Sequence, residues 1–189
     1  MAAISVINAQ KDDVGWSGKT PKLSKGPDIL VDLLLRLREA GWDLDVTLVG
    51  PNRGYVRDRL DKSNFGYLWR HDLNEAELRD LYRSSQIYLC TSRVEGGPLG
   101  PFESYLCGCS VVSTAVGMVS DYQHLPGLYV TTELSSAALA DQFEHAVSED
   151  IFSSLDPQTL DERRAKLEPL TTAFFSSQWM DVINEQQIQ

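Results

Sequence analysis

Residues 86–114, QIYLCTSRVEGGPLGPFESYLCGCSVVST, decide the fold that this sequence predicts. The stretch opens with an apolar run at 86–92, which indicates a buried strand, and it closes with a second such run at 109–114. Between the two runs, Pro101 suits the first turn of a helix, and Phe102, Tyr105 and Leu106 recur at helical spacing. We therefore expect a strand, a helix that begins near residue 100, and a second strand.

The same alternation of strand and helix extends in both directions along the chain. Further strands are predicted at 13–19, 42–51, 64–69 and 127–132. Further helices are predicted at 26–41, 55–63, 74–85, 135–148, 157–168 and 177–187. Asn74 and Glu77 form a capping-box pattern at the start of one helix, and Pro27 suits the first turn of another. Short connections between strands and helices indicate a doubly wound, Rossmann-like α/β fold with a parallel sheet.

The length of 189 residues favours a single domain, with a linker at 1–13 and C-terminal helices at 150–189. No apolar run approaches the roughly 18–20 residues that span a bilayer. The first residues lack a basic segment followed by an apolar one, which argues against a secretory signal. The three cysteines, Cys90, Cys107 and Cys109, are an odd number and suit a reducing compartment. We therefore expect a cytoplasmic protein without a transmembrane segment.

The charge is strongly acidic overall but is unevenly distributed. A net charge of −10 argues against a nucleic-acid-binding protein, which would usually present a basic face. Residues 1–26 nevertheless carry four lysines against two aspartates. This pattern predicts a local basic patch for one anionic ligand.

Loops of mixed composition are predicted to meet at one edge of the sheet. In doubly wound folds, ligands bind beyond the carboxyl ends of the strands. The segments 17–26, 50–51, 92–100 and 113–118 all fall at that edge if the predicted elements are right. The first of them, SGKTPKLSKG, has lysines that could meet phosphate oxygens as flexible point charges.

Glu95 and Glu103 bracket the glycine-rich loop, and three interpretations of the pair are open. Glu103 could stabilise the helix dipole from the first turn, which is a purely structural role. The two carboxylates could form a hydrolase pair, which needs carboxyl groups about 5–10 Å apart. The helix N-terminus and the glycines could instead form a phosphate site with a carboxylate on each side.

The combination of segments resembles one known family. SKG at 24–26, ELRDLYRSSQIYLCTSRVEGG at 77–97 and ESYLCGCSVVSTAVG at 103–117 are similar to the C-terminal, nucleotide-sugar-binding half of GT-B-fold glycosyltransferases. The likeness is to family 4, the retaining enzymes with an E-x7-E motif, whose spacing Glu95 and Glu103 match. It covers roughly residues 14–120 and resumes at FFSSQWMDVI, residues 174–183. The likeness implies one half of a GT-B architecture.

The resemblance assigns a role to each candidate residue. It implies that Glu103 accepts hydrogen bonds from the ribose and that Glu95 holds the donor sugar, while Lys25 and Lys19 neutralise the leaving diphosphate. The backbone that faces the sugar and phosphate would come from Gly96, Gly97, Leu99 and Gly100.

The same resemblance places the base against a loop that includes Tyr67 and Leu68. One departure from the family pattern is Pro98, which lacks the N–H that the usual residue would offer.

The substrate would be a nucleotide diphosphate sugar such as a UDP- or GDP-sugar, and neither a cofactor nor a metal ion is expected.

The resemblance therefore implies glycosyl transfer to an acceptor, with retention of configuration and with this chain as the donor-binding half. The acceptor would bind an N-terminal domain in cis or in trans, and that half could also contact a membrane peripherally. The isolated chain is then expected to be inactive. Two alternatives remain open: a non-catalytic nucleotide-sugar-binding or assembly module, and an epimerase or phosphorylase of the same architecture.

Overall fold

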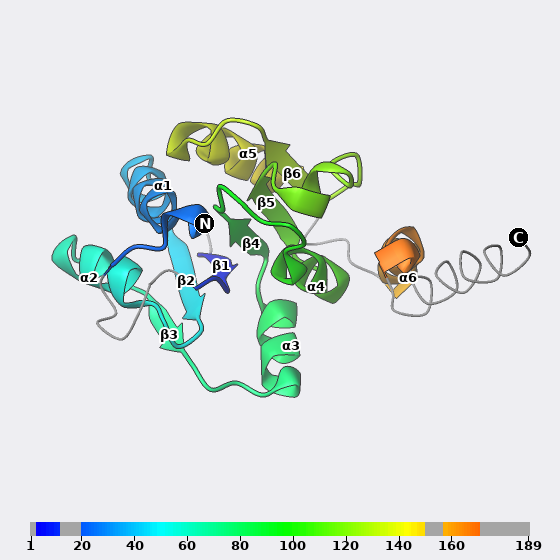
Figure 1. Ribbon diagram of the computed structural model, residues 1–189, viewed down its shortest axis with the longest axis horizontal. Coiled ribbons are helices and arrows are strands. Elements are labelled where there is room, and N and C mark those ends of the chain that lie inside the picture. The colour runs from blue at the N-terminus through cyan, green and yellow to red at the C-terminus, as the bar shows by residue number, and fades with distance from the viewer. Residues whose placement is uncertain (1–2, 12–19, 150–156, 171–189) are drawn as a thin grey trace, which may run out of the picture. The chain divides into compact units, whose positions relative to one another are not determined.

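A six-stranded parallel sheet forms the centre of the unit that comprises residues 1–154, with the strand order β3-β2-β1-β4-β5-β6 (Figure 1). The computed structural model describes residues 3–11, 20–149 and 157–170. The strands are β1 (Ile4–Asn8), β2 (Leu44–Val49), β3 (Leu68–Arg70), β4 (Ile87–Cys90), β5 (Ser110–Thr114) and β6 (Leu128–Thr131). The predicted doubly wound, Rossmann-like fold is confirmed.

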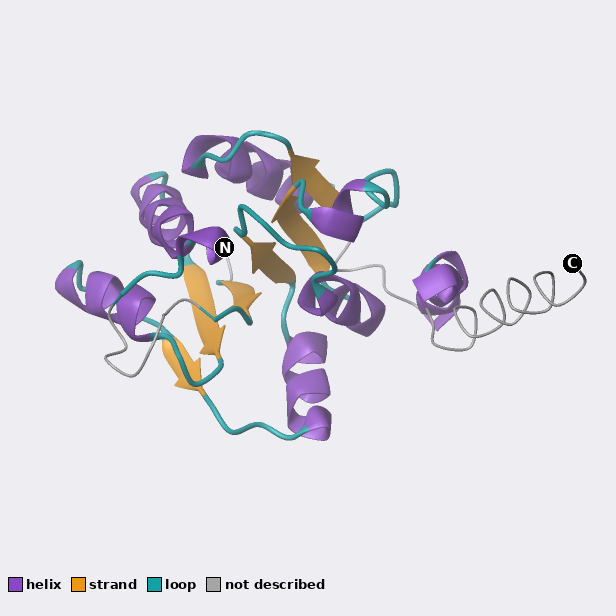
Figure 2. Ribbon diagram, viewed as in Figure 1, coloured by secondary structure: helices purple, strands orange, loops and turns teal. Residues whose placement is uncertain are grey.

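Helices cover both faces of this sheet (Figure 2). The helices of this unit are α1 (Pro27–Glu39), α2 (Gly54–Lys62), α3 (Glu75–Ser84), α4 (Leu99–Cys107) and α5 (Ser136–Ser148), with 3-10 turns η1 (Leu23–Lys25) and η2 (Gly117–Ser120). Contacts of α1 with α2 and α5 place these three on one face, and α3 packs against α4 on the other. Asn74 and Glu77 make the predicted capping box at the start of α3.

The chain divides into two compact units, residues 1–154 and 155–189. The second unit contains α6 (Pro157–Lys166) and the 3-10 turn η4 (Glu168–Leu170). The predicted helix at 157–168 is thus confirmed, whereas the helix expected at 177–187 and the segment 174–183 lie outside the described residues. None of the described helices is both long enough and apolar enough to cross a bilayer.

The first strand was predicted at the wrong place. Segment 13–19 lies outside the described residues, and β1 occupies 4–8, inside the stretch that was predicted to be a linker. The polar side chains of this strand, Ser5 and Asn8, bond to β4 and to the residue before it. The Gln86 N–H donates to the Ser5 hydroxyl at 3.0 Å, and Asn8 Nδ2 donates to the Leu89 carbonyl at 2.8 Å.

Side chains of the central strands point alternately to the two helical layers. Val6, Ile87 and Leu89 belong to the main core, which they form with residues of α1, α2 and α5. Tyr88 points the other way, and its ring contacts that of Tyr82 from α3 with 6.0 Å between centroids. Burial of both faces explains why these strands are apolar in sequence without a strict two-residue period.

We predict that Ile7→Ala lowers the free energy of unfolding by about 2–5 kcal/mol, because Ile7 is fully buried in β1 and truncation leaves a cavity. Urea denaturation followed by circular dichroism measures the change. Leu68→Ala on the edge strand β3 is the control, and it should cost less than about 1 kcal/mol because Leu68 is 49% exposed. Equal effects of the two substitutions would contradict the central position of β1.

Candidate functional site

Two adjoining pockets lie at the carboxyl ends of β1, β2 and β4. The order of the strands reverses between β1 and β4, and loops diverge at such a point in doubly wound folds. The pockets have volumes of about 310 and 300 Å³. Both are lined by Ala9, Gln10, Lys11 and Gly100. The shared lining makes them neighbouring compartments of one site.

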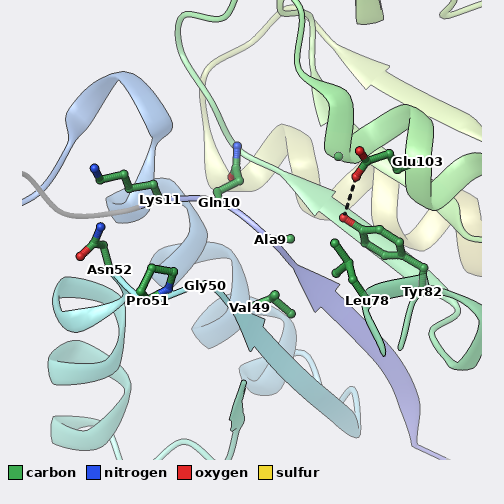
Figure 3. Close-up of a pocket in the computed structure, with 11 residues that line it drawn as sticks. Ala9, Gln10, Lys11, Val49, Gly50, Pro51, Asn52, Leu78, Tyr82 and Glu103 are labelled. Carbon is green, nitrogen blue, oxygen red and sulfur yellow. Dashed lines mark hydrogen bonds between the residues drawn. The ribbon is translucent and has the colours of Figure 1, made fainter. Parts of the chain in front are cut away.

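The first pocket contains Glu103, and Figure 3 shows this residue across the end of β1 from Pro51 and Asn52. Tyr82 of α3 donates a hydrogen bond from its hydroxyl to Oε2 of Glu103 at 3.4 Å. Burial, with the nearby Glu103 carboxylate as the next cause, raises the pKa of Tyr82 well above its ordinary value. Tyr82 is therefore a neutral donor that orients a carboxylate exposed to the pocket.

The position of Glu103 on α4 corrects one of the three interpretations. The helix begins at Leu99, so Glu103 is its fifth residue and the first turn contains no acidic side chain. A carboxylate interacts strongly with the helix dipole only within the first turn. The position of Glu103 on α4 therefore contradicts the helix-dipole interpretation, and its side chain lines the first pocket.

The second pocket contains Lys25 and Glu95, which form an ion pair through Nζ and Oε1. Their side chains are 23% and 15% exposed, so the pair is partly shielded from solvent. Ser92, which is fully buried, donates a hydrogen bond to the same Oε1 at 2.9 Å. Glu95 is thus held from two sides as a hydrogen-bond acceptor.

Gly26 places Lys25 beside Glu95. Its φ of 61° lies in the left-handed region, and it follows the 3-10 turn η1 directly. A Cβ atom at residue 26 would lie 1.8 Å from the carbonyl oxygen of Thr91, so only glycine allows this approach to the end of β4. The Thr91 hydroxyl closes the contact by donating to the Gly26 carbonyl at 2.9 Å.

A second contact fixes the same corner. Arg93 forms two hydrogen bonds to the Asp28 carboxylate, at 2.7 and 2.5 Å, and one to the Leu23 carbonyl at 2.8 Å. The hydrogen bond from Arg93, opposed by some burial, holds the pKa of Asp28 below its ordinary value. This clamp joins the start of α1 to the loop that carries Glu95.

The glycine-rich loop brings its backbone to the second pocket. Gly97, Leu99 and Gly100 line this pocket, whereas Gly96 does not. A Cβ at residue 100 would lie 2.3 Å from the hydroxyl of Tyr88, so a larger residue would force the buried Tyr88 ring to shift where α4 passes over the sheet. The start of α4 therefore adjoins both pockets.

Pro98 fits the turn in which it occurs. It is the N-cap residue of α4, and its φ of −70° is the value that the proline ring imposes. The ring is buried, so it shapes one wall of the second pocket. Because Pro98 has no N–H, the next backbone N–H groups along the chain are those of Leu99 and Gly100.

Two described residues that were predicted for the site, Tyr67 and Leu68, do not join these pockets, and a third predicted residue is not described. Lys19 lies outside the described residues. Tyr67 and Leu68 lie at the start of β3, away from the carboxyl end of the strand, and they line neither pocket. The Tyr67 hydroxyl instead donates to Asp61 at 2.8 Å.

The chain directly after β1 contributes residues to the site that were not predicted from the sequence. Ala9, Gln10 and Lys11 line both pockets, but they fell within the predicted linker. The available signal was the apolar run at 4–7 followed directly by polar residues.

Within the described ranges, no group of three or more His, Cys, Asp or Glu side chains could hold a metal ion.

A family model described as "Glycosyl transferases group 1" matches residues 11–149, well over half of the chain. The chain belongs to this family. The resemblance stated from its motifs is therefore confirmed at the level of the family. No curated protein matches the sequence.

Solved structures of similar fold include three glycosyltransferase-related proteins. TarM of S. aureus, crystallised as a mutant in complex with fondaparinux, alpha-GlcNAc-glycerol and UDP, has 15% identity and a TM-score of 0.73 over 96% of this chain and 36% of that one. The sucrose-phosphate synthase of Thermosynechococcus elongatus has 17% identity and a TM-score of 0.70, over 98% of this chain and 46% of that one.

The third structure is a UDP-forming trehalose-phosphate synthase from Burkholderia xenovorans, with 17% identity and a TM-score of 0.63 over 97% of this chain and 44% of that one. At these identities the likeness establishes the fold. The chain spans less than half the length of each of the three proteins.

We predict that Arg93→Leu raises the pKa of Asp28 toward its ordinary value, because the substitution removes the hydrogen bonds that favour the carboxylate. Carboxyl-carbon NMR titration of Asp28 measures the shift. Arg79→Leu, which removes the exposed pair with Asp80, is the matched control and should leave Asp28 unchanged.

The contact between Arg93 and Asp28 predicts how the stability of the protein changes with pH. The folded-state pKa of Asp28 is lowered, so its contribution to stability is present above the unfolded-state pKa and is lost as pH falls through the folded-state value. The wild-type protein should therefore lose more stability than Arg93→Leu between about pH 5 and pH 3. Identical losses in the two proteins would contradict the clamp.

Proposed function

We propose that this chain is the donor-binding half of a retaining glycosyltransferase that uses a nucleotide diphosphate sugar. The observation that carries this proposal is the pair of adjoining pockets, one with Glu103 and the other with Glu95 and Lys25. Membership of the glycosyl transferases group 1 family supports the reaction class. The pockets supply what such a donor needs, which is one compartment for the nucleoside and one for the phosphates and sugar.

The nucleoside occupies the first pocket in this proposal. Glu103 accepts hydrogen bonds from the two ribose hydroxyls, and Tyr82 keeps its carboxylate in place. Leu78 and Pro51 give the pocket apolar walls against which a planar base can pack. The base therefore lies beside the residues that follow β2, rather than beside Tyr67 and Leu68 as first expected.

The phosphates and the sugar occupy the second pocket. The free N–H groups at the start of α4 and the ammonium of Lys25 attract the diphosphate, and Gly97 and Gly100 allow it to approach the backbone. Lys25 has three donor hydrogens, so it can contact a phosphate while it keeps its ion pair with Glu95. Glu95 then accepts hydrogen bonds from sugar hydroxyls and orients the anomeric carbon.

The chemistry required of this half is electrostatic. As the glycosidic bond breaks, negative charge grows on the leaving diphosphate, and Lys25, with Lys19 as the second proposed cation, stabilises that charge without a proton transfer or a metal ion. An N-terminal domain, in cis or in trans, binds the acceptor.

Because Cys90, Cys107 and Cys109 are free thiols, we place the protein in the reducing cytoplasm.

We predict that the chain binds a nucleoside diphosphate or its sugar, and that Glu103→Gln weakens this binding about tenfold or more. The glutamine loses the charge that strengthens a hydrogen bond to a hydroxyl. Isothermal titration calorimetry with UDP, GDP, ADP and their sugars measures the affinities.

Glu133→Gln, which changes an exposed glutamate after β6, is the control for the altered net charge and should have no effect. Folded protein that binds none of the six ligands refutes the proposal. Unchanged affinity in Glu103→Gln would instead favour a fold that has kept the motif without its nucleotide-binding role.

A further inference from the structure

A continuous chain of hydrogen bonds runs behind the two pockets, from Arg53 to Glu95. Arg53 donates to Oδ1 of Asn8 at 2.5 Å, and Asn8 Nδ2 donates to Oε1 of Gln10 at 3.0 Å. Gln10 Nε2 donates to the hydroxyl of Ser92 at 2.6 Å, and Ser92 donates to Oε1 of Glu95 at 2.9 Å. The chain crosses from the end of β2 to β1 and then to β4.

The direction of the hydrogen bonds is fixed by groups that can only donate or only accept. A guanidinium has no acceptor, so Arg53 forces the oxygen of the Asn8 amide to face it. The Leu89 carbonyl, which can only accept, holds the Asn8 nitrogen on the other side at 2.8 Å. The Asn8 amide therefore has one allowed orientation.

The orientation of Gln10 follows for the same reason. Its Oε1 accepts from Asn8 and also from the backbone N–H of Thr91 at 3.3 Å, and both of these groups are donors. A flipped amide would place its NH₂ against two donors. The nitrogen of Gln10 must therefore point at Ser92, whose single proton is left to donate to Glu95.

We propose that Gln10 is a positioning residue that acts through Ser92 to hold the Glu95 carboxylate for the donor sugar. Within the described part of the chain, Glu95 contacts Ser92 and Lys25, and both contacts involve Oε1. This arrangement leaves Oε2 for a ligand hydroxyl. The inference rests on the proposed function, and it adds that residues 8–10 determine how strongly the site distinguishes a nucleotide sugar from the bare nucleotide.

The test substitution is Gln10→Met, which keeps the volume of the side chain and removes its amide. The readout is the ratio of affinities within the pairs UDP and UDP-glucose, GDP and GDP-mannose, and ADP and ADP-glucose. We expect affinity for the nucleotide sugar to fall about tenfold more than affinity for the nucleoside diphosphate, which is the scale of one hydrogen bond to a charged group. A structural role alone would weaken both members of a pair equally.

A double-mutant cycle with Glu95→Ala tests whether Gln10 acts through Glu95. If it does, Gln10→Met has no further effect on the affinity ratio once Glu95 is truncated. Gln86→Met is the matched control, because Gln86 bridges β1 and the start of β4 at the opposite edge of the sheet, through Oε1 to the Ser5 N–H at 3.0 Å. This control should leave the ratio unchanged, whatever it does to stability.

A crystal structure of Gln10→Met separates this inference from the proposed function. We expect the Ser92 hydroxyl to rotate away and Glu95 to leave its position beside Lys25. Glu95 unmoved and still bonded to Ser92 would overturn the inference, as would additive effects in the cycle. Absence of binding to every ligand would overturn the proposed function, and the position of Glu95 would then still decide whether Gln10 orders it.

Discussion

The pairing of β1 with β4 is the contact on which the site depends. β1 lies between β2 and β4, with Val6 opposite Ile87, and the order of the sheet reverses at this pair. The chain leaves the two strands toward opposite helical layers, so their carboxyl ends open into the two pockets. Two polar side chains connect the end of β1 to β4 and the loop that follows it. Asn8 donates a hydrogen bond to the Leu89 carbonyl, and Gln10 donates one to the Ser92 hydroxyl.

Two close backbone approaches complete the arrangement. Gly26 meets the backbone at the end of β4 at a distance that only glycine allows, and Gly100 passes over Tyr88 so closely that a larger residue would displace that ring. The first brings Lys25 to the site and the second brings the start of α4. The carboxylates of Glu95 and Glu103 thus lie in separate compartments on either side of an anion-attracting helix end, an arrangement that suits one extended ligand with hydroxyl groups at both ends and charge in the middle.

The sequence predicted the layers of this fold well because its helices and most of its strands have strong local signals. Pro27, the apolar spacing of α1 and the capping box of α3 each identify an element without help from distant residues. β1 has a weaker signal, a short apolar run at 4–7 that Ser5 interrupts, and its Ser5 and Asn8 side chains bond to residues about eighty positions away. The site residues differ in the same way. Glu95, Glu103 and Lys25 could be predicted because they belong to a recognisable motif, whereas Gln10 and Lys11 reach the site only because of where β1 lies.

The central claim is that the ligand lies across the start of α4 between the two pockets. Chemical-shift mapping by ¹⁵N–¹H NMR, with a nucleoside diphosphate added to the labelled chain, tests it most directly. We predict the largest shifts at the amides of Gln10, Lys11, Gly50, Gly97 and Gly100, which line the pockets. Shifts concentrated instead around residues 123–130, which line a separate pocket of about 420 Å³, would contradict the account.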